Sequence, residues 1–467
     1  MYIKQLYTNC LSEAAYYIES NGEAAIIDPL RDIDEYLDLV KERKSVVKYI
    51  FETHFHADFI SGHLDLSKAT GAPIVYGPNT ETAFPIHLAK DGEQFRVGAL
   101  TLEVLHTPGH TIESSCYLLK DESGHPHAIF TGDTLFVNDV GRPDLSSGNL
   151  EKEELASMLY DSLTNKIITL PDDVLVYPAH GAGSSCGKNL GPETVSTIGE
   201  QKQTNYALQP QSREDFIKSV TEGLTAPPQY FPINAKINKE GYESIDKVMD
   251  QGLTPLGIEE VKKREIDEVI ILDTRAPEVF TQGFIAGSVN IGLDGRFAEW
   301  AGSLLPFHTP IILVTDEGKE NESLIRLARV GFDKVIGYLQ GGFEAWKAAG
   351  EETDMIIDVE ADELAMDIPF DEHLQIVDVR RPTEFADGHV KNALNLPLND
   401  LTDPATMASF EEDVNLYLHC GSGYRSVIAA SLLKRQGIHN LRNVLGGWNK
   451  IKEQKSIVTE KEKSVLN

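Results

Sequence analysis

The last third of the chain contains an internal repeat, and this feature constrains the fold more than any other. Residues 271–295 (ILDTRAPEVFTQGFIAGSVNIGLDG) and 376–400 (IVDVRRPTEFADGHVKNALNLPLND) match in register. Both copies later reach a Gly-Gly-aromatic sequence, at Gly341–Phe343 and at Gly446–Trp448. Each copy is about a hundred residues long and alternates short β-branched runs with helical patterns, which indicates an open α/β sheet. We therefore predict two tandem α/β domains in this region.

The length of the chain requires a further domain. A chain of 467 residues exceeds what one hydrophobic core usually supports. We predict a first domain over residues 1–250, in which short strands alternate with turns and polar residues collect where strands end. The two repeats then occupy 251–355 and 356–456, and a charged tail that we expect to fray occupies 457–467.

Charge and cysteine usage limit the partners and the compartment. The formal net charge is −31, which argues against nucleic acid or an anionic membrane as partner, because phosphate binding needs a basic surface. No apolar run approaches the length of a membrane span, and Met1–Leu6 does not resemble a secretory signal. The four cysteines are scattered, as expected for free thiols in a reducing, cytoplasmic compartment: Cys10, Cys116, Cys186 and Cys420.

The first domain carries four segments in which a strand pattern ends in potential metal ligands. In the first, THFHAD, alternation along a strand would place His54, His56 and Asp58 on one side of the chain. The other three are Leu105–His110 (LHTPGH), Ile129–Asp133 (IFTGD) and Val176–His180 (VYPAH). One histidine at a strand end is usually structural. Four such segments in order predict a metal site built from imidazole and carboxylate ligands.

This set of motifs resembles the metallo-β-lactamase superfamily, which implies an αββα sandwich with its metal at one edge of two sheets. The two-metal hydrolases of that superfamily carry a histidine directly after the aspartate of HxHxD, as a ligand of the second metal. Phe59 occupies that position here. Because a phenyl ring cannot coordinate a metal, the sequence favours a single metal ion.

The spacing and flanking residues resemble, more narrowly, the mononuclear-iron persulfide dioxygenases, and the whole chain resembles bacterial fusions of such a dioxygenase with rhodanese domains. The resemblance implies one Fe(II) per chain, held by His54, His110 and Asp133. Two histidines and one carboxylate leave positions open for substrate and oxygen. By the same positional argument, a second set of residues would orient ligands or water: His56, Asp58 and His180.

Three residues are candidates for contacting the substrate: Arg142, Tyr177 and Cys186. Arg142 lies in Gly141–Asp144 (GRPD), which resembles a Gly-Arg-x-Asp stretch of the same family. Cys186 lies in a small-residue segment directly after the PAH motif. Two readings of its thiol stay open, a sulfur-holding group at the rim of the pocket and a buried, inert side chain.

Cys420 opens a small-residue loop in the second repeat. A strand pattern, Leu416–His419, precedes it, and a helical pattern, Val427–Gln436, follows. A strand–loop–helix junction turns backbone N–H groups inward. The helix N-terminus and Arg425 favour the thiolate, which is the nucleophile. We therefore assign Cys420 and Arg425 as catalytic residues, with the intervening loop formed by Gly421, Ser422, Gly423 and Tyr424.

The loop resembles that of rhodaneses, and this resemblance implies sulfurtransferase chemistry. Asp378–Arg380 and Gly388-His389 match an earlier rhodanese motif. Related phosphatases carry a loop one residue longer, wide enough for phosphate, so the shorter loop favours a sulfur species. In the first repeat Thr315 replaces the cysteine and Glu320 replaces the arginine. We predict that the first repeat is structural, as a spacer or an interface domain.

The two resemblances imply an enzyme that oxidises the outer sulfur of a low-molecular-weight persulfide with O2 to sulfite. Its second repeat would either pass sulfur to sulfite, forming thiosulfate, or take sulfur from thiosulfate. Glutathione, coenzyme A, bacillithiol and cysteine all stay open as the thiol carrier, and so does a homo-oligomer. One alternative is a zinc-dependent thioester hydrolase of the hydroxyacylglutathione type fused to a rhodanese. The other is a sulfane-sulfur carrier or sensor with a structural metal.

Overall fold

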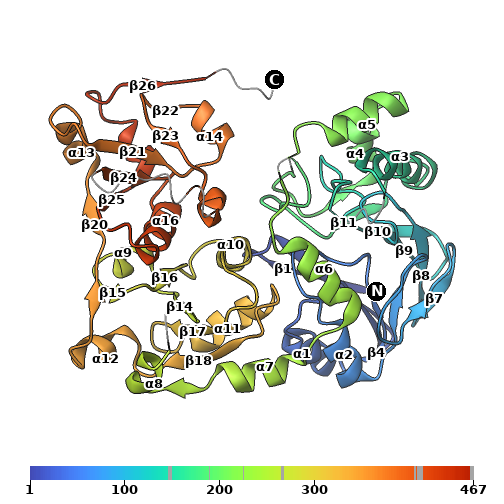
Figure 1. The fold of residues 1–467 in the computed structure, drawn as a ribbon. Helices are drawn as coiled ribbons and strands as arrows, with labels where there is room; N and C mark the ends of the chain where they lie inside the picture. The colour runs from blue at the N-terminus through green and yellow to red at the C-terminus, as the bar shows by residue number, and fades with distance from the viewer. Residues whose placement is uncertain are drawn as a thin grey trace. The chain divides into compact units, whose positions relative to one another are not determined.

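A computed structural model describes residues 1–145, 150–188, 190–224, 226–264, 268–403, 406 and 414–462. The chain forms two compact units, drawn in Figure 1. The first comprises Met1–Lys247 with Leu327–Asp333, and the second comprises Val248–Arg326 with Lys334–Asn467. Among the helices of the described residues, none has the length and apolar character needed to cross a bilayer.

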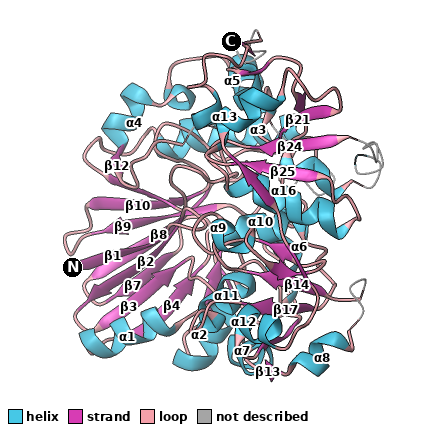
Figure 2. Ribbon diagram, turned by 90° about the vertical axis from the view of Figure 1, so that its left-hand side faces the viewer, coloured by secondary structure: helices cyan, strands magenta, loops and turns pink. Residues whose placement is uncertain are grey.

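Two six-stranded sheets form the centre of the first unit (Figure 2). The strands of the first sheet follow chain order: β1 (Tyr2–Thr8), β2 (Glu13–Ser20), β3 (Glu23–Ile27), β4 (Val46–Phe51), β5 (Ile74–Tyr76) and β6 (His87–Leu88). Those of the second sheet also lie in sequential order: β7 (Gln94–Val97), β8 (Leu100–His106), β9 (Ser115–Lys120), β10 (Pro126–Gly132), β11 (Leu175–Pro178) and β12 (Ser196–Thr197).

Side-chain alternation along the strands produces three apolar clusters, one between the two sheets and one on the outer face of each sheet. In β2, Tyr16 and Ile18 pack between the two sheets, whereas Ala15 and Tyr17 pack on the outer face. That outer face is covered by α1 (Asp34–Arg43) and α2 (His63–Thr70). The outer face of the second sheet is covered by α3 (Lys152–Ser162), α4 (Ile198–Thr204) and α5 (Arg213–Thr221). This arrangement confirms the predicted αββα sandwich. Two further helices follow, α6 (Phe231–Glu240) and α7 (Ile245–Gly252).

The second unit contains two five-stranded parallel sheets with the same topology, which confirms the tandem repeat. The first sheet has the order β13 (Pro255–Leu256), β18 (Val335–Leu339), β17 (Ile311–Val314), β14 (Ile270–Asp273) and β16 (Val289–Asn290). The second has the order β20 (Ile357–Val359), β25 (Leu441–Val444), β24 (Asn415–His419), β21 (Leu374–Asp378) and β23 (Leu394–Asn395).

Short helices flank each of these sheets. Those of the first repeat are α8 (Ile258–Lys262), α9 (Pro277–Phe280), α10 (Phe297–Leu304), α11 (Glu320–Ala328) and α12 (Gly342–Ala348). Those of the second are α13 (Ala361–Asp367), α14 (Pro382–Ala386), α16 (Tyr424–Arg435) and α17 (Gly447–Ile451). Of the tail, residues 463–467 lie outside the described part, and β26 (Thr459–Glu460) pairs with β22 (His389–Val390).

The residues that the two repeats share have a structural role. In the second repeat, Arg380 Nη2 donates to Asp378 at 2.6 Å, and the Asn395 amide donates to the Asp378 carbonyl at 3.0 Å. The first repeat makes the same contacts with Arg275, Asp273 and Asn290. The matching sequence therefore maintains the shared fold, and the chemical difference between the repeats lies in the loop that follows β17 in the first and β24 in the second.

Candidate functional site

The HxHxD segment lies in the loop after β4, and the expectation that strand alternation aligns its side chains is wrong. β4 ends at Phe51, and the backbone beyond it is irregular. The loop is held from α6, where the Asn238 amide donates to the carbonyls of His56 and Phe59, each at 2.8 Å. Packing of this loop, rather than strand periodicity, brings the metal-ligand side chains together.

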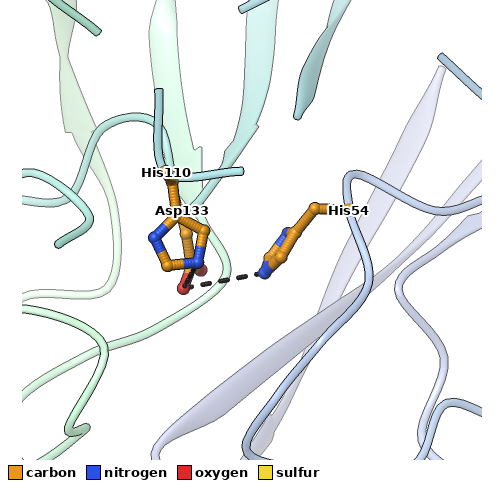
Figure 3. A group of neighbouring side chains, drawn as sticks. All are labelled: His54, His110 and Asp133. Atoms are coloured by element: carbon orange, nitrogen blue, oxygen red, sulfur yellow. Dashed lines mark ion pairs between the residues drawn. The ribbon is translucent and has the colours of Figure 1, made fainter. Parts of the chain in front are cut away.

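The structure brings His54, His110 and Asp133 together from three separate segments (Figure 3). Asp133 Oδ2 lies 3.8 Å from His54 Nε2 and 3.4 Å from His110 Nε2. All three side chains are buried, and neither carboxylate oxygen of Asp133 has a hydrogen-bond partner. An unpartnered buried carboxylate is costly in a protein interior. Two imidazoles and one carboxylate converging in this way fit a divalent metal ion such as Fe(II).

The other ring nitrogen of each histidine is fixed by a neighbouring group. His110 Nδ1 lies 2.9 Å from the carbonyl oxygen of Arg142, which can only accept a hydrogen bond, so Nδ1 carries the proton. His54 Nδ1 lies 2.9 Å from Thr53 Oγ1, and that hydroxyl donates to Asp28 Oδ2 at 2.9 Å. Because the Thr53 proton is committed to Asp28, Thr53 accepts from His54. Both histidines therefore present the lone pair of Nε2 toward Asp133.

The surroundings of His54 favour its neutral form. Burial lowers the pKa of His54 well below its ordinary value, and the neighbouring His56, His110 and His180 lower it further. A metal ligand must be the neutral imidazole, because a protonated nitrogen has no lone pair to offer. The protonation state and the tautomer of His54 thus both suit coordination.

The support from Thr53 leads to a first prediction. Thr53→Val keeps the side-chain shape but removes the acceptor for His54 Nδ1, so the ring loses its fixed tautomer. We expect iron affinity to fall about 10- to 100-fold, with the fold intact. Competition with a chelator measures the change, and Thr53→Ser is the matched control because it keeps the hydroxyl. Equal affinity in Thr53→Val and Thr53→Ser would contradict this role.

His56, Asp58 and His180 form a second cluster beside the first. His180 Nε2 lies 3.4 Å from Asp58 Oδ2 and 3.5 Å from Asp133 Oδ1, so Asp133 borders both clusters. His56 Nε2 lies 3.1 Å from Asp28 Oδ1. Burial opposes protonation of His56, but the Asp28 and Glu52 carboxylates outweigh it and raise its pKa to about 9. The predicted second set of residues is therefore adjacent to the proposed ligands.

Phe59 packs beside this second cluster. Its side chain is fully buried, and its ring lies 4.3 Å from that of His56, between centroids, at an angle of 32°. An apolar ring that cannot coordinate a metal thus lies directly beside His56. His56, Asp58 and His180 themselves lie close enough together to hold an ion, so the prediction of a single metal stays a prediction.

The three substrate-binding candidates occupy different environments. Cys186 is buried, with Sγ within 4.8 Å of ligand atoms of Asp133 and His180. Burial, and then the Asp58 and Asp133 carboxylates, raise the pKa of its thiol well above the ordinary value. The Arg142 guanidinium is buried and paired with Asp144 at 2.7 and 2.8 Å.

Tyr177 does not join these groups. Its ring packs in the core between the sheets, stacked on Phe130 with centroids 5.3 Å apart. The backbone of Arg142 contributes more directly than its side chain, because its carbonyl fixes His110 and its N–H donates to the Cys186 carbonyl at 3.0 Å. The GRPD segment thus connects a proposed ligand to the PAH loop.

Sequence reasoning missed the buried acids behind the HxHxD loop. Asp28 directly follows β3 and is fully buried, with Thr53 N donating to its Oδ1 at 2.7 Å. Glu52 and His63 are also fully buried, and His63 Nδ1 lies 3.7 Å from Glu52 Oε1. Asp28 and Glu52 each directly follow an apolar strand residue in the sequence. This position could have marked them as buried acids, which need a partner.

Cys420 lies at the carboxyl end of β24, at the start of the predicted loop. Its thiol is 1% exposed, and Gly423 N donates to its Sγ at 3.1 Å. α16 begins at Tyr424, three residues earlier than the sequence pattern indicated, and Gly423 before it has a φ of 116°. Gly447 approaches closely, since a Cβ there would lie 2.3 Å from the Cys420 carbonyl oxygen. One backbone N–H thus faces the sulfur, and Gly447 allows a neighbouring segment to pass close to the Cys420 backbone.

The first repeat contacts this loop. The Tyr424 hydroxyl donates to the carbonyl of Gly292 at 2.7 Å. A Cβ at Gly295 would lie 3.1 Å from Tyr424 Cζ, so the ring packs directly on this glycine. Gly421 and Gly423 are half-buried in the loop, and Ser422 is exposed. The cysteine-free repeat therefore forms part of the surroundings of the thiol loop in the other.

Two family models match most of the chain. Residues 8–180 match the metallo-beta-lactamase superfamily, and residues 258–349 and 360–454 each match the rhodanese-like domain. His54, His110 and Asp133 lie within the metallo-beta-lactamase match, and Cys420 lies within the second rhodanese-like match.

Relatives match both as sequences and as solved structures. The human mitochondrial persulfide dioxygenase ETHE1 is 35% identical over 42% of this chain and 70% of its own length. A probable hydroxyacylglutathione hydrolase of Schizosaccharomyces pombe is 32% identical over 40% of this chain and 78% of its own. A crystal structure described as a metallo-beta-lactamase from Staphylococcus aureus is 34% identical, covers 73% of this chain and 98% of its own, and superposes with a TM-score of 0.66.

Proposed function

Because the chain belongs to the metallo-β-lactamase superfamily, as a relative of the persulfide dioxygenases joined to two rhodanese-like domains, we propose that it oxidises low-molecular-weight persulfides to sulfite and transfers sulfane sulfur through Cys420. The observation that carries this proposal is the convergence of His54, His110 and Asp133 on one point. We propose these three residues as ligands of a single Fe(II).

The overall reaction balances without a further oxidant. One persulfide, RSSH, reacts with O2 and water to give the thiol RSH, sulfite and two protons. A bound Fe(II) with open positions would supply the site at which persulfide and oxygen meet. The chain contributes the orientation of the ligands: Asp28 and Thr53 hold His54, and the Arg142 carbonyl holds His110. Burial of all three side chains limits access of bulk water.

The second half-reaction occurs at Cys420. A persulfide on Cys420 transfers its outer sulfur to sulfite, which forms thiosulfate and releases the Cys420 thiolate. The S–S bond breaks as the new one forms, so no external electron donor is needed. The N–H of Gly423 is placed to stabilise negative charge on the sulfur. All four cysteines are free, and we propose a cytoplasmic location, where thiols stay reduced.

The zinc hydrolase is the competing function, because a hydroxyacylglutathione hydrolase is among the relatives. Phe59 argues against it, since its ring replaces a ligand of the second metal. We expect protein produced without added metal to hold about one iron per chain and to consume one O2 for each persulfide that is oxidised to sulfite. Elemental analysis and an oxygen electrode measure these two quantities. Two zinc ions per chain together with thioester hydrolysis would refute the dioxygenase assignment.

A further inference from the structure

The arginine of the Cys420 loop is paired with an acid from outside the loop. Arg425 donates from Nη1 to Glu384 Oε2 at 2.7 Å and from Nη2 to Glu384 Oε1 at 2.8 Å. The pair is half-buried, with side-chain exposures of 19% for Arg425 and 37% for Glu384. Two parallel hydrogen bonds are the strongest form of arginine–carboxylate contact. Glu384 therefore occupies the edge of the guanidinium that an incoming oxyanion would use.

Glu384 is ionised in this pair. Burial acts to raise the pKa of its carboxyl, but the hydrogen bonds and charge of Arg425 outweigh burial and hold the pKa below its ordinary value. The positive charge of Arg425, which we expected to favour the Cys420 thiolate, is thus balanced by the negative charge of Glu384. The guanidinium also lies against the loop itself, because a Cβ at Gly421 would lie 3.4 Å from Arg425 Nη2.

The two repeats differ at both positions of this pair. In the register that aligns Asp273 with Asp378, Val279 corresponds to Glu384 and Glu320 corresponds to Arg425. Val279 is exposed, at 47%. Where the cysteine and the arginine are absent, valine replaces the acid at this position, and the acid of that short helix, Glu278, lies one position earlier. The fold therefore does not require an acid at this position. The presence of Glu384 in the repeat that carries Cys420 points to a role in the chemistry of the loop.

We propose that Glu384 is a specificity-determining residue, which keeps the Cys420 loop close to neutral and thereby selects against dianionic sulfur species. Sulfite and thiosulfate must displace the Glu384 carboxylate or bind beside it, whereas the reacting sulfur of a thiol or persulfide carries at most one negative charge and hydrogen cyanide is neutral, so these groups meet less repulsion from Glu384. Glu384 then slows exchange with sulfite and thiosulfate in both directions and affects exchange between thiols and persulfides less. This inference rests on the proposed sulfurtransfer through Cys420.

A single-turnover experiment on the full chain tests the proposal. Cys420 is loaded with sulfane sulfur and mixed with sulfite, or with cyanide at about pH 8, where the neutral acid dominates. In Glu384→Gln we expect the rate constant with sulfite to rise about tenfold, because one negative charge beside a dianion is removed. The rate constant with cyanide should stay within about twofold of wild type, so the ratio of the two rates reports charge selection.

Two further variants separate charge selection from other effects. Asp387→Asn removes a carboxylate just after the same helix, 87% exposed and paired with Lys461, and should change neither rate. Glu384 Oε2 also accepts from Arg381 N at the start of α14. Glu384→Ala removes this contact as well as the charge and should raise the sulfite rate as Glu384→Gln does. A purely structural role would lower both rates together.

The outcomes are distinguishable from a failure of the proposed function. If wild-type protein transfers sulfur to neither acceptor, the assignment of Cys420 is wrong, and the role of Glu384 with it. If wild type transfers sulfur but Glu384→Gln leaves the ratio of the sulfite and cyanide rates unchanged, only the present inference is overturned.

Discussion

Replacing His110 with alanine should remove bound iron and persulfide-dependent oxygen uptake together. His110 Nε2 lies 3.4 Å from Asp133 Oδ2, and its Nδ1 is fixed by the Arg142 carbonyl, so the ring is held in the orientation that a ligand needs. We expect activity to fall by more than about a hundredfold, beyond the roughly 10- to 100-fold that loss of an outer partner of a ligand costs. His54→Ala and Asp133→Ala should behave in the same way.

The control for this prediction is His125→Ala. His125 is a histidine of the same domain whose side chain is 79% exposed, so its loss should affect neither iron nor oxygen uptake. Elemental analysis and an oxygen electrode provide the measurements, and circular dichroism establishes that each variant folds. Full oxygen uptake in folded His110→Ala would exclude this residue as a ligand.

Much of the fold follows from patterns that are local in sequence. The repeat predicted two α/β domains because matched residues such as Asp273 and Asp378 make the same backbone contacts in each copy. The strand ends of the first domain were visible because apolar runs stop there and polar residues begin. The start of α16 was misplaced because Gly423 and Tyr424 do not fit a helical hydrophobic pattern, although the backbone turns at Gly423.

The candidate site was only partly accessible to the same reasoning. His54, His110 and Asp133 were identified by the resemblance to the persulfide dioxygenases. Their side chains converge because the loops pack together, which strand periodicity does not predict. The contacts that orient them join residues far apart in the chain, such as Asp28 with Thr53 and Arg142 with His110. Glu384 likewise meets Arg425 across 41 positions, and no single-sequence pattern predicts such a pairing.

Cys420→Ser should separate the two half-reactions. The hydroxyl cannot carry a sulfane sulfur, so exchange between thiosulfate, sulfite and thiols should fall to background. Iron content and oxygen uptake should be retained, because Cys420 lies in a different unit from His54, His110 and Asp133. Given persulfide and oxygen, wild-type protein should yield thiosulfate with sulfite appearing transiently, whereas the variant should accumulate sulfite.

The time courses of sulfite and thiosulfate test whether the two half-reactions are separate. Cys10→Ser is the matched control, because it removes a free thiol that belongs to neither proposed site, and it should behave as wild type does. Thiosulfate formed at the wild-type rate by Cys420→Ser would mean that sulfite is converted elsewhere in the chain or without catalysis. Loss of iron from the variant would instead show that the two units depend on each other. If the variant accumulates sulfite and keeps its iron, Cys420 acts after the oxidation step. This order is the one that conversion of persulfide to thiosulfate requires.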